Sequence, residues 1–557
     1  MGEAETGIMD VDGAGAARGT RGRVVMLVDN GVNGDSRVQK SARSAAEAGW
    51  DVILIGKKGD SAVDTWRLGE AEVRLVPVRT DLVEPRFRRG RSLRRPLAYP
   101  DSRQAAVRLE LMHAWRADVV ARIAELRTGR GVTGGQGGLL AEPRLLVPRL
   151  GLAAASRWVR LRARETRKLR EARSNPRLPF NRLIVKYWTA TRGARAWRRL
   201  DPSLWEWELA FGKVIDELKP DLIHAHDFKM VGVGARAAAR ARAKGRDVRF
   251  VFDAHEYVPG LLPRTPGWLP AQVAYEREYI GAADAVVTVS DALADLLRRD
   301  HELAEQPTVV MNAPVLAATE ATDDALVPDL RTLCGLGPEV PLLAYSGGIT
   351  PVRGVDLVVE ALPSLPGVHL AMLSQHPTGI NRAAEKLLAR ATKLGVADRV
   401  HLLPYVPHWQ VSRVLSTADA AVSPLHHLPN HEIALSNKFF EYSHARLPLL
   451  TSDVKTMGDM VRATGQGEVF RAKDLTDFLR AVKLVLADPA KYRAAYDQPG
   501  LLEQWSWEAQ AAILDQLYTR LLPGAPGPRA RADLDAVAGP AGAARADTGP
   551  AVPVAQS

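Results

Sequence analysis

Short apolar runs recur along the chain, each ending in glycine or polar residues and followed by a segment of helical character. The first is RVVMLVDN at 23–30, after which come a glycine-containing loop, SRVQKSARSAAEAG at 36–49 and a second run, WDVILIG at 50–56. Strand, loop, helix and strand within about 35 residues form a βαβ unit. Continuous apolar strands of this kind predict a parallel sheet that is buried on both faces.

The same alternation returns later in two separate series. The first contains DLIHAH, a helix through Val231 to Ala243, VRFVFDAHE and AVVTVS, and the second contains PLLAYSG, VHLAMLS, RVHLLPYV, AAVSPL and LPLLTS. Two parallel series predict an α/β protein with two doubly wound, Rossmann-like domains.

Breaks in this alternation set the expected boundaries. The first domain is predicted at 22–312 and the second at 339–500, joined by a linker at 313–338 in which Pro, Gly and acidic residues interrupt the pattern. A helix is expected at 501–522. Both ends of the chain, 1–21 and 523–557, are expected to be disordered, since 22 of the last 35 residues are Ala, Gly or Pro.

Composition agrees with a folded protein of more than one domain. The 557 residues are 46% hydrophobic and 25% charged. The single cysteine, Cys334, excludes an internal disulfide and a multi-cysteine metal site. No run approaches the roughly 18 apolar residues of a membrane span, and the N-terminus lacks the order of a secretory signal, so a cytoplasmic protein is expected.

The net charge of +11 is concentrated in one segment. Residues 86–199 contain 29 Lys and Arg against 7 Asp and Glu, a net charge of +22, and the remainder is negative. We interpret this segment as a helical insert in the first domain. It is either a solvated decoration or a surface that meets anionic phospholipid or nucleic acid.

Tryptophans interleave the basic residues of the insert: Trp115, Trp158, Trp188 and Trp197. If 157–169 is helical, Trp158, Leu161 and Leu169 share a face about 80° wide, with arginine on most other sides. Indole and guanidinium groups together favour a membrane interface, although stacking on single-stranded nucleic acid would use the same residue types. A membrane partner is therefore expected ahead of nucleic acid.

Candidate chemistry is densest in LSNKFFEYSHARLPLL at 435–450. Ser436 is a natural N-cap, followed by Asn437 and Lys438 in the first helical turn. Free amides, the helix dipole and the Lys438 ammonium suit a diphosphate, and Glu441 lies where a carboxylate could bind a ribose diol. A core helix with a surface Lys-Glu pair explains the residues equally well.

This segment resembles the nucleotide-sugar signature of glycosyltransferase family four, which in one branch reads like PNK-FEYMAAGLPV. Three other stretches agree with that family in order: ADAVVTVSDAL, YSGGITPVRGVDLVVEAL and RVHLLPYVPHWQVSRVLSTADAAVSPL. The resemblance covers about residues 22–84 and 205–520 and leaves the insert outside. It implies the GT-B fold, with an acceptor-side and a donor domain facing across a cleft. It also implies sugar transfer with retention, without metal or cofactor.

Carried over residue by residue, the resemblance assigns the donor site. Glu441 matches the second glutamate of the E-x7-E pair, which holds the ribose. The first falls on Ile433, with Glu432 out of register, so the amides of Leu435 and Ser436 are expected to serve the sugar. Arg353 matches the basic residue that neutralises the diphosphate, and Lys438 replaces a second cation. The implied donor-binding residues are Gly347, Gly348, Arg353, Ser436, Asn437, Lys438 and Glu441.

On the acceptor side, the resemblance assigns catalysis to His226, at the end of a predicted strand where open α/β sheets bind ligands. His226 is expected to reach the crevice and His224 to remain inside the sheet. DAHEY at 253–257 supplies further candidates in Asp253, His255 and Glu256, which a structural turn would explain as well.

A glycine loop follows the first predicted strand. Gly31 and Gly34 match the loop of the family's acceptor domain, whose small residues let the backbone approach donor and acceptor.

The expected activity is transfer of a sugar from a nucleotide-diphosphate donor to a glycan or lipid-linked acceptor, by an enzyme at the inner face of the plasma membrane. Arg353, Lys438 and His226 would carry the catalysis. Two alternatives stay open: a non-hydrolysing nucleotide-sugar epimerase, against which the FEY and Arg-Gly elements argue, and a nucleic-acid-binding protein that uses the insert.

Overall fold

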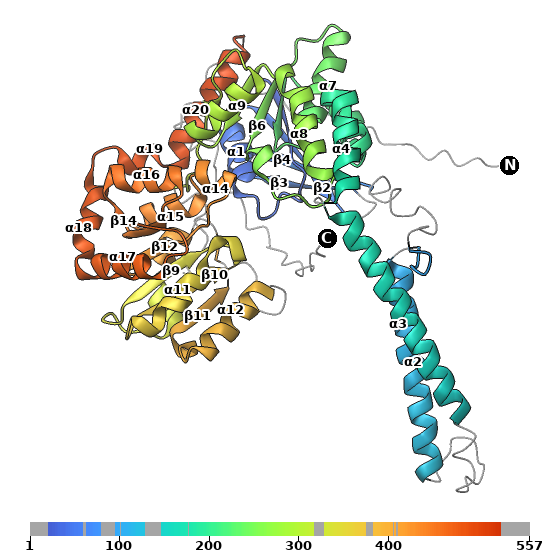
Figure 1. Cartoon of the computed structure of the whole chain (residues 1–557). Coiled ribbons are helices and arrows are strands. Elements are labelled where there is room, and N and C mark those ends of the chain that lie inside the picture. Colours follow the sequence, from blue (N-terminus) through green and yellow to red (C-terminus); the bar gives the residue numbers. More distant parts are fainter. Residues whose placement is uncertain are drawn as a thin grey trace, which may run out of the picture.

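The computed structural model describes residues 21–59, 63–79, 95–100, 102–128, 146–175, 178–316, 328–374, 382–404, 406–407 and 410–524. Nearly all of both predicted tails, and residues 317–327 of the predicted linker, lie outside the described residues. The described residues form two α/β domains and a pair of long helices that projects from the first of them (Figure 1).

The first domain contains an eight-stranded sheet with the order β3-β4-β2-β1-β5-β6-β7-β8. All neighbouring strands are parallel except β3 and β4, which form an antiparallel hairpin at one edge that the pattern did not predict. Gly69, with φ of +59°, makes the turn between them. The strands are β1 (Arg23–Leu27), β2 (Asp51–Lys58), β3 (Asp64–Leu68), β4 (Ala71–Pro77), β5 (Leu222–His226), β6 (Arg249–Ala254), β7 (Ala285–Thr288) and β8 (Thr308–Val309).

Five longer helices cover this sheet: α1 (Ser36–Glu47), α6 (Leu204–Leu218), α7 (Val231–Ala243), α8 (Trp268–Tyr279) and α9 (Asp291–His301). The glycines of α7 allow close packing. A Cβ at Gly232 would lie 2.4 Å from the Tyr275 hydroxyl, and one at Gly234 would lie 2.4 Å from Cε2 of Phe250. The VGVGARAAARARA sequence therefore folds as a helix pressed against α8 and β6.

The second domain contains a six-stranded, wholly parallel sheet with the order β11-β10-β9-β12-β13-β14. Its strands are β9 (Leu342–Ser346), β10 (His369–Ser374), β11 (Val400–Pro404), β12 (Ala420–Ser423), β13 (Leu449–Ser452) and β14 (Gly467–Phe470). Its helices are α10 (Leu330–Cys334), α11 (Val355–Ala361), α12 (Arg382–Lys393), α13 (Val411–Leu415), α14 (Pro429–Ile433), α15 (Asn437–His444), α16 (Lys455–Thr464), α17 (Leu475–Ala487), α18 (Pro489–Arg493) and α19 (Leu501–Gln504). The two predicted doubly wound domains are confirmed.

The last described helix, α20 (Trp507–Leu521), returns to the first domain (Figure 1). Trp507 donates from Nε1 to Ser44 Oγ at 2.7 Å, and the Tyr518 hydroxyl lies 2.5 Å from Nδ1 of His224. Asp515 forms an ion pair with Arg21, with Oδ1 2.6 Å from Nη1. The first domain thus contains both ends of the described chain.

The insert contains α2 (Ser102–Thr128) and α3 (Leu146–Ser174), which pair and project away from the sheet (Figure 1). Tyr99 contacts Thr166 and Trp115 lies against Gly151, so the two helices run antiparallel. Trp158 on α3 is 50% exposed. No helix in the described part of the chain is long and apolar enough to cross a membrane.

After α3 the chain rejoins the first domain through α4 (Pro179–Arg192) and α5 (Trp197–Leu200). The prediction that Trp197 is one of the interfacial tryptophans was wrong. It is completely buried, packs edge-on against Tyr275 with ring centroids 4.9 Å apart and donates from Nε1 to Glu278 at 2.5 Å. Its indole nitrogen finds a carboxylate inside the domain, which makes Trp197 a core residue.

Candidate functional site

The loop after β9 is shaped by two glycines. Gly347 has φ of +121° and Gly354 has φ of +69°, and a Cβ at Gly354 would lie only 1.9 Å from the carbonyl oxygen of Pro424. The position therefore requires glycine, and the loop lies tightly against the end of β12. At Gly348 a Cβ would meet no atom within 4 Å, so this part of the loop borders open space.

The two cations assigned to the diphosphate converge on this loop. A Cβ at Gly347 would lie 3.4 Å from both Arg353 Nη1 and Lys438 Nζ, which leaves a small cradle between them. Lys438 is 5% exposed, and its Nζ lies 4.3 Å from the ring centroid of Tyr345. Among the described residues neither cation forms an ion pair with a carboxylate. A buried and a half-buried cation, neither in ion-pair contact with a carboxylate of the described residues, suit an anion.

The surroundings of Lys438 oppose the charge of its ammonium group. Burial lowers the pKa of its ammonium well below the usual range, and the guanidinium of Arg353 lowers that pKa further. A bound diphosphate would supply the missing negative charge and favour the ammonium form.

Ser436 occupies the N-cap position of α15 as predicted, but its side chain makes no capping hydrogen bond. The amide of Phe439 donates instead to the backbone carbonyl of Ser436 at 2.9 Å, and Oγ is buried with no partner. The expectation of side-chain capping was wrong. The hydroxyl and the first-turn amides of Asn437 and Lys438 stand beside the cradle as donors for a ligand.

Glu441 lies farther along α15, close to the end of β9. Its Oε2 accepts a hydrogen bond of 3.4 Å from Ser346 Oγ. Burial raises the pKa of Glu441, while Lys40 and Lys438 act in the opposite direction. A half-buried carboxylate with unused acceptor capacity suits a diol.

Lys40 of α1 is a component of this region that the sequence analysis missed. Its Nζ donates to Asn312 Oδ1 at 2.8 Å and to the Ala313 carbonyl at 2.5 Å, at the crossover between the domains. Burial, followed by Arg37, lowers the pKa of Lys40 to about 7, and Glu441 opposes that shift. A lysine on the apolar side of the helix between Val38 and Ala42 was the available signal.

Ile433, which stands where the family has its first glutamate, lies at the contact between the second domain and the first. Ile433 packs against the core of the first domain, and its carbonyl accepts from Ser290 Oγ at 2.6 Å. Asn430 exchanges two hydrogen bonds with the backbone of Tyr257, at 2.8 and 3.1 Å. Glu432 accepts from His427 Nδ1 at 2.6 Å and from the amide of Lys455 at 2.8 Å. Its carboxylate is therefore engaged at the start of α16.

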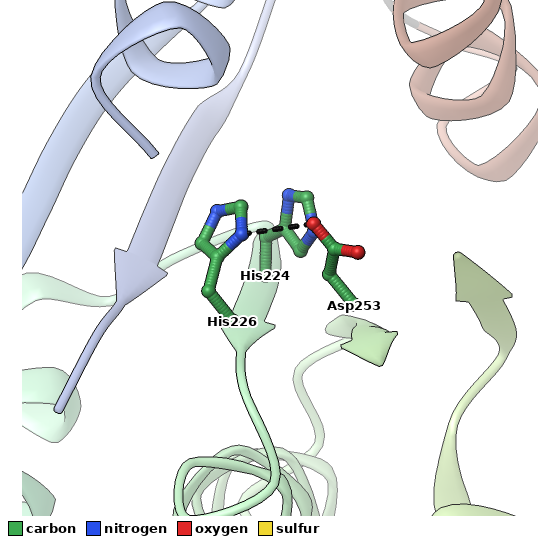
Figure 2. A group of neighbouring side chains, drawn as sticks. All are labelled: His224, His226 and Asp253. Atoms are coloured by element: carbon green, nitrogen blue, oxygen red, sulfur yellow. Dashed lines mark hydrogen bonds and ion pairs between the residues drawn. The ribbon is translucent and has the colours of Figure 1, made fainter. Parts of the chain in front are cut away.

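In the first domain, two histidines of β5 meet an aspartate of β6 (Figure 2). His226 Nδ1 lies 3.0 Å from Asp253 Oδ2. Arg37 of α1 binds both Asp253 oxygens at 2.9 Å and donates to the Val310 carbonyl at 2.7 Å. Burial alone would raise the pKa of Asp253, but Arg37, His255 and His226 hold it well below the usual range.

His226 does not reach the crevice as predicted, since both His224 and His226 are 0% exposed. Residues two apart share one face of a strand, and α20 and the Arg37–Asp253 pair cover that face. Nε2 of His226 is buried with no hydrogen-bond partner. Because Nδ1 is directed at a carboxylate, the neutral ring carries its proton there and leaves Nε2 as an acceptor.

Ligand atoms of His224, His226 and Asp253 lie within 4.8 Å of one another, close enough to hold a metal ion. Arg37, however, already binds both carboxylate oxygens of Asp253. A metal ion would have to displace or lie beside that guanidinium, so the geometry favours an oriented histidine over a metal centre. The prediction of no metal stays a prediction.

Polar residues surround this cluster at the carboxyl ends of β1, β5 and β6. His255 Nε2 lies 3.1 Å from Asp253 Oδ2, and Glu256 is exposed beside it. Asp227 follows His226 at the end of β5 and has φ of +71°. Burial and then Asp29 raise its pKa to about 7. Such a set of carboxylates can accept hydrogen bonds from the hydroxyls of a polyol.

The glycine loop borders the same edge of the sheet. Gly34 has φ of +88°, and a Cβ at Gly31 would lie 3.7 Å from the Lys57 carbonyl. The loop therefore runs close to the end of β2, where its backbone can line the crevice.

Comparison with known families finds two matches. Residues 142–315 match Glycosyltransferase Family 4, and residues 335–500 match Glycosyl transferases group 1.

Curated proteins also match this chain. A glycogen synthase of Mycobacterium tuberculosis is 28% identical over 326 residues, which cover 56% of this chain and 72% of that protein. A D-inositol 3-phosphate glycosyltransferase of Mycobacterium marinum is 25% identical over 257 residues, covering 45% of this chain and 53% of that protein. The match thus spans about half the length of the second relative.

Solved structures share the whole two-domain fold. Sucrose-phosphate synthase from Thermosynechococcus elongatus gives a TM-score of 0.56 at 15% identity, covering 90% of this chain and 100% of that one. Anabaena Alr3699/HepE in complex with UDP-glucose gives a TM-score of 0.53 at 12% identity, covering 89% and 100%. At these identities the likeness concerns the fold.

Proposed function

The chain belongs to the glycosyltransferases that combine a Family 4 domain with a group 1 domain in the GT-B fold, and from this premise we propose that its donor is a nucleoside-diphosphate sugar. The acceptor in this proposal is a glycan or lipid-linked sugar of the cell envelope, met at the cytoplasmic face of the membrane, and transfer retains the anomeric configuration. The observation that carries the donor assignment is the convergence of Arg353 and Lys438 on the Gly347 cradle. The UDP-glucose complex of a protein with the same fold supports it.

In this proposal the diphosphate lies in the cradle. Arg353, Lys438 and the first-turn amides of α15 stabilise the negative charge that grows on the leaving diphosphate as its bond to the sugar breaks. Glu441 holds the ribose. The protein supplies no nucleophile, and the proposal requires neither metal nor cofactor.

In this proposal His226 acts on the sugar; because its ring is 0% exposed in this structure, substrate binding must uncover it. Its unpartnered Nε2 accepts a hydrogen bond from a hydroxyl of the transferred sugar, while Asp253 fixes the tautomer that makes this possible. Asp253 is therefore a positioning residue. His255 and Glu256 bind the acceptor.

A nucleotide screen tests the proposal most directly. UDP-, GDP-, ADP- and dTDP-sugars are added separately, and the one that raises the unfolding temperature identifies the nucleotide, since a ligand that binds the folded state stabilises it by mass action. Stabilisation by none of them would contradict the donor assignment. Conversion of the sugar with no acceptor present would favour the epimerase.

We expect Glu441→Ala to weaken binding of the nucleotide that passes this screen by about 2 to 4 kcal/mol, because a ribose hydroxyl loses a charged acceptor in a partly buried site. Isothermal titration measures the effect. Glu360→Ala is the matched control, because this glutamate lies in the same domain but pairs with Arg390 at the surface. Equal affinities of both variants and the parent would remove Glu441 from the site.

We expect His226→Ala to reduce kcat much more than donor affinity, because its contact is to the sugar at the reacting carbon. Initial rates and titration with the nucleotide separate the two effects. His401→Ala, a half-buried histidine of the second domain, controls for loss of an imidazole. Normal turnover in His226→Ala with an intact fold would move the role to another residue.

A further inference from the structure

Helix α4 presents large apolar side chains to solvent. Phe180 is 55% exposed, Leu183 64%, Ile184 38% and Tyr187 56%. At the helical step these four positions fall within an arc of about 100°. The opposite side of α4 packs on the first domain through Val185 and Trp188. The exposed arc is therefore an apolar stripe on a helix that the domain holds in place.

All charged residues of α4 are basic. The sequence of α4, PFNRLIVKYWTATR, contains Arg182, Lys186 and Arg192 and no acidic residue. Among the described residues neither Arg182 nor Lys186 is ion-paired. A basic helix with an exposed apolar face matches the pattern of helices that lie in the headgroup layer of anionic membranes.

A groove of about 720 Å³ lies on the other side of α4 from the stripe, between this helix and the segment that leads into α8. Its walls include Val185, Pro263 and Leu269, with Arg182 and Lys186 at one side. This volume falls within the range of pockets that bind small molecules. An apolar groove bordered by cations suits a molecule with an apolar chain and an anionic head.

The groove adjoins the acceptor side of the cleft. Its wall at 263–270 follows closely after Glu256, and the ring of Trp268 meets that of Phe228 at 6.3 Å, directly beyond β5. Arg264 lies near enough to Glu256 to act on its charge. A lipid held at α4 would thus have its head directed toward the candidate acceptor residues.

We propose that α4 docks this protein on an anionic lipid surface, with the apolar stripe in the headgroup layer and an apolar lipid chain in the groove. The proposal rests on the proposed function for its purpose, since it brings a lipid-linked acceptor to the cleft. It assigns contact to α4 and not to the projecting α2–α3 pair. The helix pair also exposes apolar side chains, among them Leu111 and Trp158, but α4 adds a groove on the side of the candidate acceptor residues.

The test is sedimentation of the full chain with vesicles of phosphatidylglycerol and phosphatidylcholine in equal parts, and with phosphatidylcholine vesicles alone. The parent should bind the anionic vesicles and dissociate as salt rises. We expect Leu183→Ser with Tyr187→Ser, and separately Arg182→Glu with Lys186→Glu, to reduce the apparent affinity by about tenfold or more. Thr189→Trp, which narrows the groove without changing charge, should reduce it severalfold.

Matched controls test whether vesicle binding depends on where an apolar or basic residue lies and not only on its type. Leu484→Ser removes an exposed leucine of α17, and Lys213→Glu reverses an exposed lysine of α6. Both should bind vesicles like the parent. A third variant changes Arg160, Arg164, Arg167 and Lys168 of α3 to Glu.

Loss of binding in this α3 variant alone would overturn the assignment to α4, as would unchanged binding in both α4 variants. Binding of the parent to single-stranded nucleic acid without binding to vesicles would also overturn it. UDP binding is measured in every variant. If UDP does not bind the parent, GDP, ADP and dTDP are titrated as well; absence of binding by all four would count against the donor site and leave the vesicle result to decide on α4.

Discussion

Removing both cations of the Gly347 cradle, with Arg353→Ala and Lys438→Ala together, is expected to eliminate measurable sugar transfer and to weaken binding of the nucleoside diphosphate identified by the screen by about 4 to 6 kcal/mol. Each single variant should lose about 2 to 4 kcal/mol. The reason is that Arg353 Nη1 and Lys438 Nζ each lie 3.4 Å from the point that a Cβ at Gly347 would occupy. A diphosphate placed there contacts both, so neither cation can replace the other.

Lys438 adds a pH signature to this prediction. The pKa of Lys438 is lowered chiefly by burial, and a bound diphosphate is expected to raise it. Affinity is therefore greatest below the pKa of the free protein and falls as pH rises toward the pKa of the complex. Titration in buffers of different ionisation enthalpy should detect proton uptake in the parent and none in Lys438→Ala. Identical uptake in both proteins would assign the proton to another group.

The second large effect is expected for Asp253→Asn. The substitution keeps the shape of the side chain but removes the charge that neutralises Arg37, whose side chain is 4% exposed. An uncompensated buried guanidinium is expected to lower the free energy of unfolding by about 3 to 5 kcal/mol. Denaturant unfolding of the first domain measures this loss. Asp247→Asn, which breaks an exposed pair with Arg249, should change it by less than about 1 kcal/mol.

The pH dependence of unfolding gives an independent readout of the same cluster. Burial lowers the pKa of His224 and of His226 in the folded protein. The unfolded chain therefore binds more protons as pH falls below about 6.5, and stability decreases in that range. The contribution of Asp253, whose folded pKa is depressed, persists until pH falls below about 3.9. His255, whose folded pKa is raised, acts in the opposite direction, so the test is the difference between the parent and a His224→Gln variant from pH 7 to 5. An equal decrease in both proteins would contradict a buried neutral His224.

The sequence predicted what depends on local pattern. Apolar runs ending in glycine produced both sheets, and the spacing within SNKFFEY brought Lys438 and Glu441 to the start of one helix, facing the Gly347 loop. The position of each of these residues follows from its own segment, because parallel strands end at the same edge of a sheet.

Contacts between distant segments were not predictable in this way. Arg37 and Asp253 are 216 residues apart, and nothing near either residue indicates the other. His226 was expected at the crevice because it ends a strand, but α20 and the Arg37 pair cover that face. Trp197 was grouped with interfacial residues because its neighbours are basic, whereas Glu278 and Tyr275 hold it in the core. In each case packing from another part of the chain overrode the local signal.

The return of α20 to the first domain has a consequence for biosynthesis. Tyr518 and Asp515 contact residues near the N-terminus and in β5, so the first domain cannot complete its core until the ribosome has made nearly the entire chain. The second domain contains all strands of its own sheet within a continuous segment and can fold earlier. We therefore expect the half that is synthesised first to finish folding last, leaving the apolar surface around His224 in need of protection until release.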